Sequence, residues 1–229
     1  MLTKCIGIIS YFPSNIVIRT ERKNRFNRLI NILNTYFKLP IVIIAQNWTN
    51  EDFLNINYCN KVYIYQYNNG LGITKARMIL RDKLLKFDYD YFIFLDDDSD
   101  IKCTVDSANK YLLEIDTHPD MVGKYFNTWP RLLAISKSML TIMDYDYISN
   151  LEASRGEIWE DMAYIKTYER LYPNKFFKFS KENISEVSPV SKKDTYSTWY
   201  KKEFGTESAI SRKTREIIER WYNYKSRRR

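Results

Sequence analysis

Short, mostly apolar runs alternate with amphipathic segments along the first hundred residues of this chain. Four runs have the length and composition of strands, namely residues 4–10, 41–45, 61–65 and 91–95, and the run at 91–95 is expected to be buried on both faces. Between the first two, apolar residues recur at three- and four-residue spacing and predict a helix: Phe26, Leu29, Ile30, Leu33 and Phe37. Another helix is expected from the turn residues at 68–72 to about Lys86. Such alternation is typical of βαβ units and predicts an α/β fold, with a mainly parallel sheet flanked by helices.

The second half of the chain continues this pattern less regularly. Residues 104–115 are expected to form a helix with Val105, Ala108 and Leu112 inward, and another helix is expected to begin near Glu160. The remaining elements are short strands at 121–126, 132–135 and 176–179 and an amphipathic helix at 207–224. We therefore expect residues 1–179 to form the main domain. Residues 180–229 would add a lid-like loop and a basic C-terminal helix, within the same domain or as an extension.

Three consecutive carboxylates follow the apolar run at 91–95. Asp96, Asp97 and Asp98 repel one another and have poor strand propensity. They are therefore expected where the strand ends, at the carboxyl edge of the sheet, where open α/β folds bind ligands. Oxygen ligands from Asp96 and Asp98 suit Mg²⁺ or Mn²⁺ held jointly with a substrate diphosphate. The alternative is an acidic turn, or an Asp that caps the following segment.

The composition excludes several classes of protein. Gly and Pro number only six each in 229 residues, which argues against a disordered or fibrous chain. Three separated cysteines without a CxxC pair fit reduced thiols and give no zinc site. The single histidine, His118, excludes a His-rich metal site. No apolar run reaches the length of a membrane span and no signal peptide is recognisable, so we expect a cytoplasmic protein.

The formal net charge of +8 is concentrated in two regions. Residues 201–229 hold ten basic and four acidic side chains, a net of +6. A second region, the basic cluster, consists of five cations that are accompanied by Glu21: Arg19, Arg22, Lys23, Arg25 and Arg28. Such regions attract polyanions, whether nucleic acid, nucleotide diphosphates or an anionic membrane surface. The alternative is a solvated helix face and a soluble tail.

Two pairs of charged residues each allow two interpretations. Arg77 and Arg81 lie four apart on the helix that follows residues 68–72, so they can face the acidic edge and phosphates bound there, or pair only with Asp82 or Asp88. Glu160 and Asp161 suit the first turn of a helix, where the helix dipole favours negative charge. A purely structural role therefore stays open for both pairs beside a functional one.

The order of the strands, helices and acidic motifs along the chain resembles that of the GT-A glycosyltransferases, especially the family-2-like inverting enzymes. The resemblance covers roughly residues 4–170. It consists of an apolar strand with an aromatic-Pro loop at 11–13, an Asn/Gly turn before Ala76-Arg77 at a helix start, a strand that ends in a DxD pattern, and a downstream Glu-Asp pair.

The resemblance implies a metal site and a donor. Asp98 would be the metal ligand, with Asp96 assisting it or contacting the ribose, and Asp97 would contact the nucleotide sugar. The ion, Mn²⁺ or Mg²⁺, would bridge the two phosphates of a nucleoside-diphosphate sugar and neutralise the departing diphosphate as a Lewis acid.

The resemblance also implies roles for residues around that site. Arg77 would face the diphosphate, and Tyr11 and Pro13 would line the base pocket. Asp161 would be the general base that takes the proton of the acceptor hydroxyl, an arrangement that inverts the anomeric centre. The chain departs from the family at 46–48, where Gln46 and two following residues stand in place of an acidic residue that commonly grips the base. An amide can still bind a base edge, but a uracil donor is not implied.

The acceptor is the least constrained partner. The basic cluster, the basic tail and five Trp residues suit a polyanion. One hypothesis is a viral-type DNA glycosyltransferase that modifies a hydroxymethylated pyrimidine and acts in the host cytoplasm. The alternative acceptor is a saccharide, a lipid-linked sugar or a protein side chain, with the cationic tail in peripheral contact with an anionic membrane.

Two other classes compete with a glycosyltransferase. A nucleotidyltransferase would share the architecture, but it should carry a Gly-rich, basic loop directly after the first strand, and residues 11–15 are not such a loop. A non-catalytic nucleic-acid-binding module would explain the charge, but it would leave the acidic motifs without a use.

Overall fold

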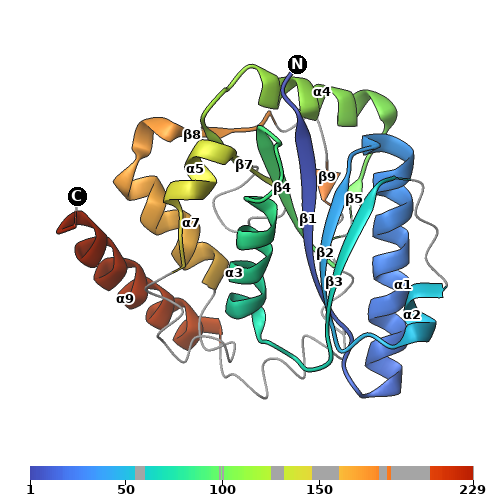
Figure 1. The fold of residues 1–229 in the computed structure, drawn as a ribbon. Coiled ribbons are helices and arrows are strands. Elements are labelled where there is room, and N and C mark those ends of the chain that lie inside the picture. Colours follow the sequence, from blue (N-terminus) through green and yellow to red (C-terminus); the bar gives the residue numbers. More distant parts are fainter. Residues whose placement is uncertain are drawn as a thin grey trace.

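The computed structural model describes residues 1–54, 60–97, 99, 101–124, 132–145, 160–180, 185–186 and 207–228. A seven-stranded sheet runs through the described part of the chain in the order β3-β2-β1-β4-β7-β6-β8 (Figure 1). Its strands are β1 (Lys4–Tyr11), β2 (Ile41–Gln46), β3 (Val62–Tyr67), β4 (Tyr91–Asp96), β6 (Val122–Lys124), β7 (Leu133–Ser136) and β8 (Phe176–Lys178).

Four neighbouring strands form a parallel core of the sheet. β1 pairs in parallel with both β2 and β4, and β2 pairs in parallel with β3. β7 is antiparallel to both of its neighbours, β4 and β6, whereas β6 and β8 are parallel. A separate two-stranded antiparallel sheet joins β5 (Ile101–Lys102) to β9 (Ser185–Glu186). The expected α/β fold with a mainly parallel sheet is therefore confirmed.

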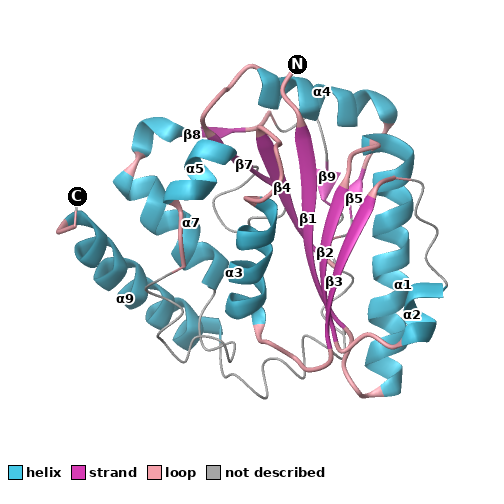
Figure 2. Ribbon diagram, in the orientation of Figure 1, coloured by secondary structure: helices cyan, strands magenta, loops and turns pink. Residues whose placement is uncertain are grey.

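Helices cover both faces of the sheet, as Figure 2 shows. They are α1 (Ile16–Ile32) with its π-helical continuation η1 (Leu33–Phe37), α2 (Asn50–Leu54), α3 (Ile73–Leu84), α4 (Val105–Asp116), α5 (Lys137–Ile142), α7 (Glu160–Leu171), the 3₁₀ turn η3 (Pro173–Lys175) and α9 (Glu207–Ser226). Buried side chains of α3, α5, α7 and α9 form one apolar cluster with one face of the sheet. Those of α1 and α4 form a second cluster with the other face. The inner strands β1, β2 and β4 are buried on both sides, because alternate residues enter different clusters. The edge strand β3 is only half-buried.

Local features agree with the expectations in part. α1 follows the loop after β1, as expected, and starts where the Asn15 side chain accepts hydrogen bonds from the amides of Val17 and Ile18 and caps the helix. No element was predicted at residues 50–54, where α2 lies. In α4, Val105 is 57% exposed, so its expected inward position is wrong. Helix α9 is confirmed as the C-terminal basic helix.

In the described residues, no helix has both the length and the apolar character needed to cross a membrane. Cys5 is buried and Cys103 is half-buried, and both carry free thiols. Cys59 lies outside the described residues. Most of the candidate lid at 180–198 does so as well.

Candidate functional site

Asp96 is the last residue of β4 and meets Arg77 from α3. The parallel register places Asp96 beside Ile9 of β1, at the carboxyl edge of the sheet. Nη2 of Arg77 lies 2.9 Å from Oδ1 of Asp96. Arg77 is only 7% exposed, whereas the Asp96 side chain is 27% exposed. Arg77 therefore faces the acidic edge, as one of its two interpretations expects, and leaves the carboxylate of Asp96 partly open to solvent.

Arg81 has a structural role, which was the second interpretation of the two arginines. Its guanidinium donates to the carbonyl oxygens of Leu140, Thr141 and Met143, at 2.9–3.0 Å, and pairs with Asp82. These carbonyls end α5, so Arg81 satisfies the acceptors that a helix leaves unpaired at its C-terminus.

Asp97 follows the strand in a turn and is buried, with 3% exposure. Its Oδ2 accepts hydrogen bonds from the Ser10 hydroxyl at 2.8 Å and from the Tyr11 amide at 3.1 Å. Its Oδ1 lies 3.1 Å from Nη2 of Arg22 on α1. Asp97 thus joins the carboxyl ends of β1 and β4 to α1, and a direct contact with a nucleotide sugar stays a prediction.

Tyr11 ends β1 at the same edge of the sheet. The residue is 37% exposed, and its ring lies against Gly70 in the turn before α3, where an added Cβ would come within 3.2 Å of the ring. Pro13 follows in the loop and is half-buried. The two residues predicted to line a base pocket therefore lie beside the acidic edge.

Asp161 lies in the first turn of α7 and is 6% exposed. Its Oδ1 accepts a hydrogen bond from the Met162 amide at 2.7 Å, and the helix N-terminus favours its negative charge. Asp161 and Arg77 line one cavity of about 10 Å³ together with six apolar or aromatic side chains: Phe94, Leu133, Ile135, Tyr145, Tyr164 and Ile165. A volume of this size admits about one water molecule. The cavity therefore brings the carboxylate predicted as the base close to the cation that binds Asp96, but it is too small for a sugar.

Of the two predicted metal ligands, only Asp96 lies within the described residues. Asp98, the predicted metal ligand, lies outside them. Within them, no group of three or more His, Cys, Asp or Glu side chains is placed to hold a metal ion. Mg²⁺ commonly takes only one or two protein carboxylates and completes its shell with phosphates and water. The partly exposed oxygens of Asp96 at a strand end fit one such ligand.

The residues that replace the family's acidic residue hold loops together. Oε1 of Gln46 accepts a hydrogen bond from the Leu71 amide at 2.8 Å, and Nδ2 of Asn47 donates to the Phe12 carbonyl at 2.7 Å. Trp48 is 4% exposed and stacks on the Phe12 ring, with centroids 4.8 Å apart. These contacts give no support to a role for these residues in binding a base.

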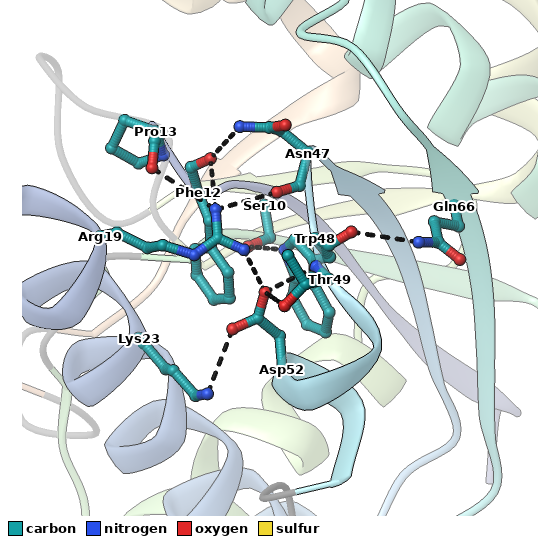
Figure 3. Close-up of polar contacts among 10 residues, drawn as sticks. All are labelled: Ser10, Phe12, Pro13, Arg19, Lys23, Asn47, Trp48, Thr49, Asp52 and Gln66. Carbon is teal, nitrogen blue, oxygen red and sulfur yellow. Dashed lines mark hydrogen bonds and ion pairs between the residues drawn. The ribbon is translucent and has the colours of Figure 1, made fainter. Parts of the chain in front are cut away.

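Asp52 is a buried carboxylate that the sequence analysis missed. Figure 3 shows it between Arg19 and Lys23 of α1 and Thr49. Burial alone would raise the pKa of Asp52, but hydrogen bonds from Thr49 and Lys23 and the Arg19 charge together hold that pKa below its ordinary value of 3.8. The signal was present, because Thr49 and Asp52 have the spacing of a capping box, which marks the start of α2.

The fold has relatives among solved structures, although no protein-family model matches the chain and no curated protein matches it. A protein from Desulfovibrio desulfuricans G20, assigned as a nucleotide-diphospho-sugar transferase, is 14% identical with a TM-score of 0.55, and the match covers 96% of this chain and 99% of that one. TarS residues 1–349 from S. aureus are 12% identical with a TM-score of 0.54, over 80% of this chain. This chain covers 59% of that fragment, which has also been crystallised with UDP-GlcNAc.

A nucleotide-handling synthetase shares the same architecture. CMP:2-keto-3-deoxy-manno-octonic acid synthetase in complex with CTP is 10% identical with a TM-score of 0.50, over 86% of this chain and 97% of that one. At these identities, the likeness concerns the fold. The chain therefore has the GT-A-type fold that these nucleotide-handling enzymes share.

Proposed function

We propose that this chain is a glycosyltransferase that moves a sugar from a nucleoside-diphosphate sugar to an acceptor hydroxyl. The observation that carries the proposal is that Arg77 has a link to each of two carboxylates, a hydrogen bond to one and a shared cavity with the other. Arg77 binds Asp96 at 2.9 Å and lines the same small cavity as Asp161. Arg77 thus links Asp96, at the carboxyl edge of the sheet where α/β folds bind ligands, to the cavity that the candidate base Asp161 lines.

The donor would lie along the ends of β1 and β4. Tyr11 and Pro13 would line the pocket for the nucleoside, and the exposed Tyr11 ring offers an apolar face to a base. Asp96 and Asp97 would face the ribose and the diphosphate, with Arg77 balancing the local negative charge. The complex of the TarS fragment with UDP-GlcNAc supports this class of donor on the shared fold.

A divalent cation, Mn²⁺ or Mg²⁺, held by Asp96 and Asp98 would supply Lewis-acid neutralisation of the diphosphate leaving group. Arg77 would keep the Asp96 carboxylate in place for this purpose, because a charge-assisted hydrogen bond fixes the orientation of its partner. Apolar side chains around Arg77 would limit the access of water.

Asp161 would act on the acceptor. Its carboxylate would accept the proton of the attacking hydroxyl while that oxygen forms a bond to the anomeric carbon and the bond to the diphosphate oxygen breaks. Attack from the face opposite the leaving group inverts the anomeric centre. The N-terminus of α7 would favour negative charge on Asp161, the form that can accept a proton.

The shared fold does not by itself separate a glycosyltransferase from a nucleotidyltransferase. The loop after β1 supports the glycosyltransferase, because Phe12 is fully buried and the loop has no glycine and no basic side chain of its own. Hexosyl transfer is the finer form of this proposal.

For the acceptor, we propose a hydroxymethylated pyrimidine in DNA, as in a viral-type modification within the host cytoplasm. Exposed cations on α9 and directly after it favour this acceptor: Arg212, Lys213, Arg215, Arg220, Arg227 and Arg228. A saccharide, a lipid-linked sugar or a protein side chain is the alternative. We also keep the division into residues 1–179 and 180–229 as a proposal.

The base assignment is tested by two neighbouring substitutions, Asp161→Asn and Glu160→Gln. We expect Asp161→Asn to lower sugar transfer by about 10²-fold or more, because positioned proton transfer is lost, and to leave the affinity for a nucleoside diphosphate with Mn²⁺ unchanged. Glu160→Gln should transfer at close to the normal rate. Transfer and nucleotide affinity are measured by product formation and by calorimetry.

Two results would contradict parts of this proposal. Normal transfer by Asp161→Asn would remove the base assignment. A wild-type protein that binds no nucleoside diphosphate, with or without Mn²⁺, would refute the proposed donor class as a whole.

A further inference from the structure

The basic cluster is mostly used inside the molecule. Arg22 pairs with Asp97, Arg19 and Lys23 pair with Asp52, and Arg25 pairs with Glu21 on its own helix. Arg28, in contrast, is exposed. A polyanion would have to compete with these internal carboxylates, so the cluster needs another explanation.

Arg22 and Asp97 together bind the backbone of Tyr11. Nη1 of Arg22 donates to the Tyr11 carbonyl at 3.2 Å, and Nη2 lies 3.1 Å from Oδ1 of Asp97. The other oxygen of Asp97 accepts the Tyr11 amide at 3.1 Å and the Ser10 hydroxyl at 2.8 Å. Both polar backbone groups of Tyr11 are therefore bound by one ion pair, which fixes the direction in which the Tyr11 ring leaves the strand.

Arg19 holds the next two residues of the same loop. Its Nη1 lies 3.2 Å from the Phe12 carbonyl oxygen and 3.4 Å from that of Pro13, and also binds the carbonyl of Asn47 at 3.1 Å (Figure 3). Its Nη2 binds Asp52. Three consecutive carbonyls, of residues 11–13, thus accept hydrogen bonds from two arginines that lie three apart on α1.

We call Arg19 and Arg22 the two clamps, because each guanidinium binds carbonyl oxygens of the loop while a buried carboxylate neutralises its charge. Asp52 and Asp97 have side-chain exposures of 4% each. A planar guanidinium can bind a carboxylate with one nitrogen and a carbonyl with the other, which the point charge of a lysine does less well. A loop held in this way is ordered before a ligand arrives, so ligand binding does not have to order it.

We propose that Arg19 and Arg22 are positioning residues, which hold the loop at residues 11–13 in the shape that binds the nucleoside of the donor. This inference rests on the proposed function and deepens it. It replaces the polyanion interpretation of the basic cluster, because buried carboxylates inside the molecule already neutralise the charges of Arg19 and Arg22.

The test compares Arg22→Lys and Arg19→Lys with Arg28→Lys in the full-length protein. The first two keep the positive charge but cannot form the forked arrangement, and Arg28 lies on the same helix outside both clamps. Hydrogen exchange of the Tyr11 amide, read by NMR or from peptides that cover residues 10–13, reports on the loop without any ligand. Calorimetry with UDP, GDP, ADP and CDP in Mn²⁺, and the donor KM and kcat, report on binding.

We expect both clamp variants to exchange the loop amides faster, and to weaken nucleotide binding and raise the donor KM by about tenfold, the effect of removing one charge-assisted hydrogen bond. Their kcat should stay within about twofold of wild type, because uniform binding is reduced and not the chemical step. Arg28→Lys should change none of these. Two clamp variants are used so that a misfolded one does not end the test.

Unchanged loop exchange in both clamp variants would overturn the inference, and so would faster exchange with normal nucleotide affinity. Salt-dependent retention on duplex DNA is measured in parallel. A loss of retention in Arg22→Lys with unchanged nucleotide affinity would restore the polyanion interpretation. Failure of the proposed function is seen separately, because the wild-type protein would then bind none of the four nucleotides.

Discussion

Asp52 shows at the scale of one residue how a buried charge is kept. Its carboxylate is 4% exposed at the side chain and accepts hydrogen bonds from Thr49 and two cations of α1. Removing one partner of such a pair is costly, because the remaining cations lose their counter-charge but stay largely buried, with side-chain exposures of 14% for Arg19 and 23% for Lys23.

We therefore expect Asp52→Asn to reduce the free energy of unfolding by about 3 kcal/mol at pH 7. The pKa of Asp52 is lower in the folded protein than its ordinary value of 3.8. Its contribution is therefore fully present above the unfolded-state pKa and is lost as pH falls through the folded-state pKa. Urea unfolding at several pH values measures the difference from wild type.

That difference should stay constant from about pH 7 to pH 5 and shrink only below about pH 4. A difference that already shrinks between pH 7 and pH 5 would mean that another group is responsible. Glu51→Gln, at the exposed neighbouring position, is the matched control and should change stability by less than about 0.5 kcal/mol.

Single residues were predictable from the sequence where the local pattern was strong. The acidic motif was placed at a strand end, and Asp96 is the last residue of β4. The partners of Asp97 were not predictable, because Ser10 and Arg22 are 87 and 75 residues away in the sequence. Only the fold brings them together.

At the scale of elements, the short strands β6 and β8 pack closely, because aromatic rings lie directly over Gly123 of β6. Gly123 of β6 pairs with Phe177 of β8. A Cβ added at Gly123 would lie 2.5 Å from ring atoms of both Phe177 and Phe179. The Phe177 ring stacks on His118, with centroids 3.9 Å apart, so it has little room to move.

Gly123→Ala is therefore expected to destabilise the protein by about 2 kcal/mol through overpacking. Gly7→Ala is the matched comparison, because its Cβ would lie 2.9 Å from a terminal methyl of Leu84, which can rotate away. Thermal unfolding should show the larger loss for Gly123→Ala. An equal or smaller loss would mean that the two rings shift together at little cost.

The elements differ in how well the sequence predicted them. The strands buried on both faces were recognisable from their continuous apolar runs. α1 was predicted from the apolar residues of its second half, because none of its first ten side chains is buried and Phe26 is the first that is. β5 and β9, with two residues each, carry too little pattern to be predicted and form only by pairing with each other.

At the scale of the whole molecule, α9 is part of the core. Trp221 is fully buried and its ring lies 5.6 Å from that of Tyr168 on α7. Lys225 binds Asp144 at 2.8 Å, near the end of α5. Truncation of the chain before α9 would therefore expose apolar surface as well as remove charge. A test of DNA binding must keep the helix and change only its exposed side.

We expect the combined substitution of Arg212, Lys213 and Arg215 by Gln to weaken binding to duplex DNA. The salt dependence should fall by about 0.9 in the log–log slope for each phosphate that these side chains no longer neutralise. The measurement is retention on DNA between about 50 and 200 mM salt. Equal removal of charge at three exposed lysines elsewhere, Lys38, Lys86 and Lys175, is the control.

If both triple variants lose retention equally, α9 has no special role in DNA binding, and retention depends only on the net positive charge of the protein. If the α9 variant alone loses retention, the acceptor proposal gains support. Circular dichroism should show unchanged helix content in both variants, because the substituted side chains lie outside the core.

The docking of α9 on α7 also sets an order of events during synthesis. Helix α7, whose first turn holds Asp161, leaves the ribosome some fifty residues before Trp221 does. Until Trp221 has been synthesised, it cannot pack on the rings of Tyr164 and Tyr168. The nascent chain then exposes an aromatic surface that is prone to aggregation. A chaperone that shields this surface, or slow translation after α7, would decide how much of the newly made protein reaches its final form.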